Sequence, residues 1–234
     1  YMATSAQNKT SKKKVSKKSK TYITHKNVMT YSLLIKQKTD NYLRSIDPND
    51  FNPQDITIGL LDDTCDAIRK YNNKHDTHWT IPNDLLPYQI ASIIANLHHA
   101  ALIVLNSANI GSDHAILAIY NTTGPNKGLY TMERDEFLKL AYTYKPTLTS
   151  KEFDEVLQAL RSMVPLRQRS NNEDLIPVNN GVFDYRIKQF LPFSPNLVFT
   201  AKSHINCNPT AENVVLHNDS DNTDWDVESW MKSL

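Results

Sequence analysis

With 234 residues, the chain is long enough to bury one large apolar core or two small ones. Hydrophobic residues make up 40% and charged residues 22%, a balance typical of globular domains that excludes a fibrous or wholly disordered protein. Two distant cysteines and the lack of any apolar run near the ~20 residues of a membrane helix exclude a disulfide-rich or membrane-spanning chain, so we expect a cytoplasmic protein.

The net charge of +1 conceals a basic N-terminal arm. Ten lysines precede the first acidic residue, Asp40, and the rest of the chain is therefore at −9. Clustered lysines bind nucleic-acid phosphates because they release counterions. We expect residues 1–24 to be disordered and to contact DNA through Lys12, Lys13, Lys14, Lys17, Lys18 and Lys20. The alternatives are a solubilising tail or a tail that binds protein, and no aromatic residue is interleaved with these lysines to stack on bases.

Helices are expected over residues 25–108. Apolar residues at helical spacing predict one helix over 27–42 and a second over 53–71. Residues 72–83 are polar and predict a loop. After Pro87 the sequence is apolar on most sides, which predicts a buried helix over residues 88–105.

Residues 109–210 are expected to form an α+β module. Short β-type runs at 115–120 and 129–132 predict a hairpin with a long loop. A helix is expected over 133–144, and Thr149 with Glu152 forms the capping-box pattern of a further helix that ends near Val164.

These two helices, followed by β-rich sequence, are compatible with a helix-turn-helix and a wing. In that arrangement the candidate phosphate contacts are Lys151, Arg161, Arg167 and Arg169. The alternative is a pair of ordinary packed helices with a solvated outer face.

The stretch from Leu175 to Pro209 contains short strands separated by turns. Asn180-Gly181 is the dipeptide of a tight hairpin turn with positive φ at both central residues. Each proline removes a ladder donor, so the strands are short, ending or at an edge. The residues that we assign to this structural motif are Pro177, Asn179, Asn180, Gly181, Asp184, Pro192 and Pro195. Residues 211–234 are expected to be a linker and the start of a helix.

Patterns of known catalytic sites are absent from the sequence. It contains neither G-x-x-x-x-G-K-[ST] nor G-x-G-x-x-G nor G-x-S-x-G. Asp62, Asp63 and Asp66 are candidate magnesium ligands on one helix, with an exposed acidic face as the alternative. His75-x-x-His78 and His98-His99 lack a third ligand at zinc-like spacing and are expected to be structural. We therefore expect no catalytic residue, metal or cofactor within this chain.

One stretch resembles a known family. It is Asp174-Leu-Ile-Pro-Val-Asn-Asn-Gly-Val-Phe-Asp184, followed by Leu191-Pro-Phe-Ser-Pro195 and by the segment from Thr200 to Pro209. This order resembles the module that precedes the superfamily 3 helicase core in phage and plasmid primase–helicases, the poxvirus-type N-terminal-like region. A helix with tryptophans leads into the ATPase in that family, and Trp225 and Trp230 match it in kind.

The resemblance implies a role in DNA replication of phages or mobile elements. It predicts DNA as the partner, a homo-oligomeric ring, and ATP with Mg²⁺ at a helicase domain that this chain lacks. The chain would then serve DNA binding, self-loading or ring assembly. The alternatives are a replication accessory or helicase loader without a motor, and a magnesium-dependent nuclease or primase that uses the three aspartates. A G-x-x-x-x-G-K-[ST] in the reading frame beyond Leu234 would separate the first two.

Overall fold

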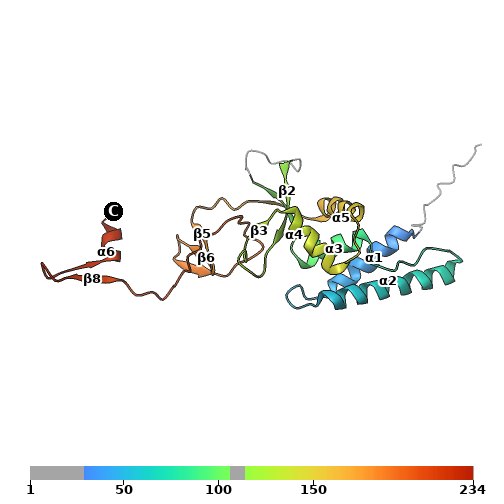
Figure 1. Ribbon diagram of the computed structural model, residues 1–234, viewed down its shortest axis with the longest axis horizontal. Coiled ribbons are helices and arrows are strands. Elements are labelled where there is room, and N and C mark those ends of the chain that lie inside the picture. Colours follow the sequence, from blue (N-terminus) through green and yellow to red (C-terminus); the bar gives the residue numbers. More distant parts are fainter. Residues whose placement is uncertain (1–28, 106–113, 234) are drawn as a thin grey trace, which may run out of the picture.

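The computed structural model describes residues 29–105 and 114–233, and the predicted disordered arm of residues 1–24 lies outside this part. The fold class is α+β, as predicted, with a helical N-terminal half. Figure 1 shows three groups of elements along the long axis. Helices and a four-stranded sheet lie at one end, a small sheet lies in the middle, and a hairpin with a short helix lies at the other end.

Helices form the first part, and their bounds are α1 (Tyr31–Arg44), α2 (Pro53–His75) and α3 (Pro87–Leu97). The Thr30 side chain caps α1 by accepting a hydrogen bond from Leu33 N at 3.2 Å, and the Asn52 side chain caps α2 in the same way. α2 ends at His75, and the next residue, Asp76, takes the left-handed conformation (φ 50°) typical of a residue after a helix. The predicted first two helices are confirmed, with α2 one turn longer than expected.

The helix predicted over residues 88–105 is wrong in its second half. α3 ends at Leu97, and the chain then turns through His99 (φ 48°) into strand β1 (Ala101–Val104). The prediction failed because both segments are buried on most sides, and continuous burial does not distinguish a helix from a central strand. The chain leaves α3 and forms β1 because β1 has strands to pair with on both sides.

β1 lies inside a four-stranded sheet of order β3-β2-β1-β4. The other strands are β2 (Ile116–Tyr120), β3 (Tyr130–Thr131) and β4 (Leu166–Gln168). β2 pairs antiparallel with β1 and with β3, which confirms the predicted hairpin, whereas β4 pairs in parallel with β1. β1, which precedes residue 108, therefore pairs with two strands that follow it. The domain boundary that we predict at residue 108 stays a prediction.

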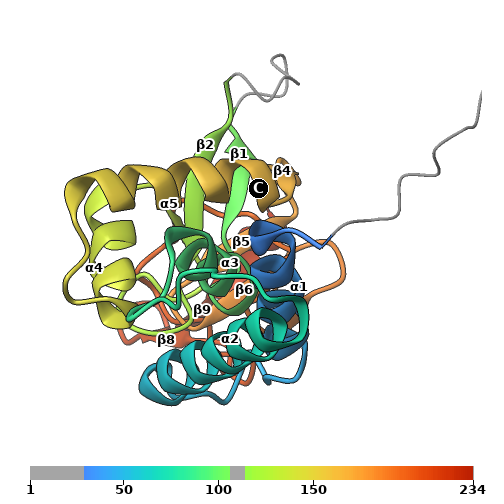
Figure 2. The same cartoon turned by 90° about the vertical axis from the view of Figure 1, so that its right-hand side faces the viewer.

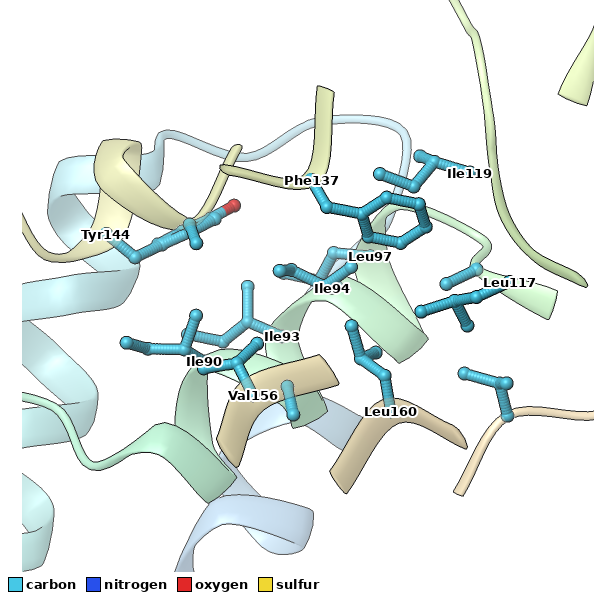
Figure 3. Packing of buried hydrophobic residues seen from close by; sticks show 14 of the residues in the cluster. Ile90, Ile93, Ile94, Leu97, Leu117, Ile119, Phe137, Tyr144, Val156 and Leu160 are labelled. Carbon is cyan, nitrogen blue, oxygen red and sulfur yellow. The ribbon is translucent and has the colours of Figure 1, made fainter. Parts of the chain in front are cut away.

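The two faces of this sheet bury different partners. Leu102, Val104, Leu117 and Ile119 face the helices and belong to the main apolar core. Figure 3 shows how this core packs Ile90, Ile93 and Ile94 of α3 against Val156, Leu160, Phe137 and the sheet. The opposite face, with Ala101, Ile103 and Tyr130, packs on Val198 from the C-terminal part. The sheet thus connects the helices to the C-terminal part of the chain.

Helices α4 (Arg134–Tyr144) and α5 (Ser150–Met163) come after β3. The predicted capping box is confirmed, because Thr149 Oγ1 accepts from Glu152 N at 3.3 Å while Glu152 Oε2 accepts from Thr149 N at 2.9 Å. α5 packs mainly against α3, and both lie over the sheet in Figure 2. The strand after α5 joins β1 in parallel, whereas a wing would be an antiparallel hairpin, so β4 does not form the wing of a winged helix.

The remaining strands form two small antiparallel sheets. β5 (Leu175–Val178), β6 (Gly181–Asp184) and β7 (Gln189–Leu191) make one, in the order β5-β6-β7. β8 (Val215–Asn218) and β9 (Thr223–Asp226) make a hairpin that precedes α6 (Val227–Lys232). The helix expected near the C-terminal end is confirmed, but the hairpin before it stands where we predict a linker.

Candidate nucleic-acid interface

The basic residues predicted to bind DNA fall into two sets. Lys12, Lys13, Lys14, Lys17, Lys18 and Lys20 lie outside the described residues. Lys151, Arg161, Arg167 and Arg169 belong to α5, to β4 and to the residue after it. Lys151 and Arg161 are exposed but ten residues apart, or about 15 Å along a helix. The structure therefore does not gather the four into one compact cluster.

The outer face of α5 has mixed charge. Lys151 and Arg161 share it with Asp154 and Glu155, which are also exposed. Asp154 accepts a hydrogen bond from Arg134 Nη2 at 2.7 Å. Because acids and bases balance on this face, it offers little net attraction to phosphate, and the helix is a weak candidate for DNA recognition.

Arg167 holds the C-terminal part to the sheet. Its Nη1 donates to Pro195 O and to Asn196 Oδ1, both at 3.2 Å, and its side chain is half-buried. Burial, and to a lesser degree the Arg167 charge, lowers the pKa of His99. Arg169 is exposed and lines a hollow of about 220 Å³ with Leu105 and Asn171. Of this pair, Arg169 is thus the residue available to a phosphate.

The motif from Leu175 to Pro209 is assembled by its asparagines. Asn180 Nδ2 donates to Cys207 O and Asn180 Oδ1 accepts from Cys207 N, each at 2.9 Å. Asn179 Nδ2 donates to Asn206 Oδ1 at 2.9 Å. The turn between β5 and β6 is therefore held to the Asn-Cys-Asn-Pro segment by hydrogen bonds from side-chain amides. The two bonds between Asn180 and the Cys207 backbone resemble those of a pair of β-strands.

Gly181 is needed for a different reason than predicted. Val178 pairs with Gly181, so the central turn residues are Asn179 and Asn180, and Gly181 is not among the described residues with positive φ. A Cβ on Gly181 would instead collide with the Phe190 ring and lie 2.7 Å from Leu191 O. Close approach of β7, rather than backbone conformation, requires glycine here.

The other motif residues also have structural positions. Pro177 lies on the edge strand β5, and Pro192 comes directly after β7, as expected for residues without an N–H. Asp184 Oδ1 accepts from Arg186 N at 3.0 Å and shapes the turn before β7. Pro195 O accepts from the Tyr130 hydroxyl at 2.7 Å, which joins this part to β3.

Two of the three candidate metal ligands are paired with bases. Asp63 lies 3.2 Å from Lys38 Nζ, and Asp66 lies 3.0 Å from Arg69 Nη1. Within residues 29–105 and 114–233, no group of three histidine, cysteine or acidic side chains has a geometry suited to a metal ion. In the same part of the chain, no helix is long and apolar enough to cross a bilayer.

His98 lies at the edge of the apolar core. Its Nε2 is 2.7 Å from the Tyr144 hydroxyl, and it borders a polar hollow of about 300 Å³ with Asn121, Thr131 and Lys139. Burial lowers the pKa of His98 to about 4 and raises that of Tyr144. His98 is therefore neutral at pH 7, and its contact with the Tyr144 hydroxyl fits the structural role predicted for it.

An aromatic stack at the end of α2 was not predicted. Tyr71 stacks on His75 with ring centroids 4.3 Å apart, and on Trp79 with centroids 4.2 Å apart. Tyr31 meets Trp79 edge-on at 5.7 Å. The i, i+4 spacing of Tyr71 and His75 on a helix was a readable signal. Trp79 joins them only because the loop folds back, which spacing does not reveal.

Comparison with known proteins identifies the family. A family model described as D5 N-terminal-like matches residues 60–232, well over half of the chain. The chain belongs to the D5 N-terminal-like family. This family is the N-terminal region of poxvirus D5-type primase–helicases, so the predicted resemblance is confirmed. No curated protein matches the chain. The D5 N-terminal-like region includes α3–α5, every described strand and the aromatic stack.

Proposed function

We propose that this chain is the DNA-engaging part of a replicative primase–helicase from a phage, plasmid or mobile element, and that it acts ahead of an ATP-driven superfamily 3 motor. The observation that carries this proposal is the family match over residues 60–232. The ten lysines before Asp40 support DNA as the partner, because a dense run of cations gains counterion-release entropy on a phosphate backbone.

Nucleotide chemistry belongs to a separate motor in this proposal. The 234 residues contain no phosphate-binding glycine loop, and Asp63 and Asp66 of α2 are paired with Lys38 and Arg69. We therefore assign ATP and Mg²⁺ to the motor domain, and DNA binding to this chain.

The test compares the chain with a variant lacking residues 1–26 on a fluorescent 20-nucleotide oligo(dT) at two salt concentrations. The intact chain is expected to bind with strong salt dependence, and the deletion to lose most of the affinity and most of the salt slope. The melting temperature should stay unchanged, because the deleted residues are rich in Lys, Ser and Thr and poor in apolar side chains. Equal affinity and slope for both proteins would refute the DNA-binding role of the arm.

Self-assembly is the second part of the proposal, and the C-terminal hairpin supports it. Leu216 and Trp225 of the hairpin are 57% and 44% exposed, and Trp230 of the adjoining α6 is 48% exposed. A two-stranded hairpin is only marginally stable alone, so one with exposed apolar side chains favours a protein partner. We propose that this partner is a second copy of the chain. If the chain is instead an accessory or loader, the same surface would bind a different protein.

Light scattering after size exclusion separates these two alternatives. Ring assembly predicts that the intact chain associates with rising concentration, and that a Leu216→Asp, Trp225→Ser variant stays monomeric. A monomeric intact chain at high concentration would contradict self-assembly through the hairpin and favour the accessory function.

A further inference from the structure

The aromatic stack at the end of α2 presents one ring face to solvent. Two rings stacked about 4 Å from Tyr71 occupy opposite faces, since they would overlap on the same face. Tyr71 is therefore sandwiched between His75 and Trp79, and both of its own faces are covered. His75 is exposed, so its outer face is the open end of the stack.

The fold uses Trp79 but does not require the outer face of His75. Asn72 Nδ2 donates to Trp79 O at 2.9 Å, and Trp79 N donates to Asn72 Oδ1 at 3.0 Å. These two bonds and the Tyr71 ring hold the loop after α2 against the helix. His75 takes no part in these hydrogen bonds, so the packing of the loop does not account for its exposed ring face.

Two lysines lie to one side of the exposed ring. Lys70 and Lys74 are one helical turn apart on α2, next to Tyr71 and His75, and both are exposed. Within the described residues neither has an acidic partner at salt-bridge distance, whereas Lys38 of α1 and Arg69 are paired with the acids of α2. The end of α2 thus combines an open ring face with free positive charge.

The basic arm is attached at the same place. The Tyr71 hydroxyl donates to Met29 O at 3.4 Å, which fixes the first described residue beside the stack. Figure 1 places the start of α1 and the end of α2 at one end of the molecule, opposite the C-terminal hairpin.

We propose that this end of α2 is a binding site for single-stranded DNA, where a base stacks on the outer face of His75 and Lys70 and Lys74 contact the flanking phosphates. The inference rests on the proposed function. The site would add base stacking to the phosphate contacts that we propose for the lysine arm. An aromatic ring beside cations is the arrangement that holds single strands without sequence preference, and a duplex, whose bases are already stacked on each other, gains nothing from the ring.

The test measures oligo(dT) affinity of four full-length proteins at fixed salt. His75→Ala is expected to weaken binding about tenfold, since base–aromatic stacking contributes on the order of one decade or more in affinity. His75→Phe keeps a ring and should bind within about twofold of the native chain. His78→Ala is the matched control, because His78 is an exposed histidine in the loop that follows α2 and has no ring contact within the described chain. On duplex DNA the four proteins should bind alike.

Crosslinking provides a readout without substitution. An oligonucleotide with 5-iodouracil, irradiated on the native chain, should attach to the peptide that contains Tyr71 and His75. If the native chain binds DNA in a salt-sensitive manner while His75→Ala is equal to it and crosslinks map elsewhere, the site is wrong and the proposed function stands. If the native chain binds no oligonucleotide, the proposed function fails and the site fails with it.

Discussion

The helical body and the motif region between Leu175 and Pro209 are stabilised in different ways. The body buries one continuous apolar cluster drawn from α1 to α5 and two strands. Among the described residues, the cluster beneath the small sheet has three buried members, Leu129, Val182 and Phe199. There the chain is held instead by side-chain amides and carbonyls, such as the Asn180–Cys207 pair and the Arg167–Pro195 bond.

This difference teaches that the two regions respond to different changes. Burial makes the body sensitive to lost volume, because each buried methylene contributes about 0.8 kcal/mol. The motif region depends on hydrogen bonds of about 1 kcal/mol each and on close backbone approach. It is therefore the part that deforms or opens first, consistent with a connecting segment between the body and the C-terminal hairpin.

The largest effect is expected from a cavity in the body. Leu60 is fully buried, so Leu60→Ala should lower the free energy of unfolding by about 2–5 kcal/mol in urea titrations. Ile58, on the same helix and 61% exposed, is the control, and Ile58→Ala should change stability by less than about 0.5 kcal/mol. Equal losses for the two variants would show that the cluster is not the source of stability.

A pH effect of up to about 3 kcal/mol is expected from His98 in the body. The unfolded residue binds a proton near pH 6.5 and the folded one only near pH 4, so acid favours the unfolded chain. The stability that neutral His98 contributes is complete above pH 6.5 and declines as the pH falls to 4. Urea titrations across this range should show a steeper decline for the native chain than for His98→Gln. Parallel curves would contradict the buried, neutral state.

In the motif region, Gly181→Ala should cost about 1–3 kcal/mol through the clash with β7. Gly124→Ala separates this cause from backbone strain, because Gly124 has φ 75° and open space around it. That change should cost about 1–2 kcal/mol with no effect on the small sheet. Hydrogen exchange of β6 and β7 should rise for Gly181→Ala alone, and unaltered exchange there would refute the close-approach explanation.

The smallest effect on stability is expected from removing the side-chain amides of Asn179 and Asn180. Asn180→Ala removes two hydrogen bonds to the Cys207 backbone and should cost about 1–2 kcal/mol locally. Asn179→Ala removes one side-chain bond, to Asn206, and should cost about half as much. Exchange measured by mass spectrometry at residues 203–209 reports the difference. A variant whose exchange matches the native chain would mean that the amides do not hold this segment.

Sequence predicted the elements whose signals are local. The caps of α5, the stripe of α2 and the hairpin of β2 and β3 are set by neighbouring residues, and each was correct within a few residues. β1 was missed because its identity depends on β4, more than 60 residues later. The β8–β9 hairpin was missed because its strands are exposed and lack a buried face that would produce alternation.

The candidate site also has features that sequence reveals locally and features that depend on the fold. The lysine arm is visible in sequence as a charge run, and the aspartates of α2 are visible as a cluster on one helix. The pairing of Asp63 with Lys38 and of Asp66 with Arg69 depends on the packing of α1 and on side-chain rotamers. Arg167 was expected to contact a phosphate, but its guanidinium donates a hydrogen bond to the carbonyl of Pro195, which is far from it in sequence. The Tyr71 stack needs a loop to fold back, so only the structure brings it together.

The most direct test of DNA engagement is the salt slope of oligo(dT) binding by the native chain and by a variant with Lys12, Lys13, Lys14, Lys17, Lys18 and Lys20 changed to glutamine. If the six lysines contact phosphates, the slope of log affinity against log salt should become shallower by about 4, since each single-strand contact contributes about 0.7. Identical slopes for the two proteins would contradict the assignment of DNA binding to the arm.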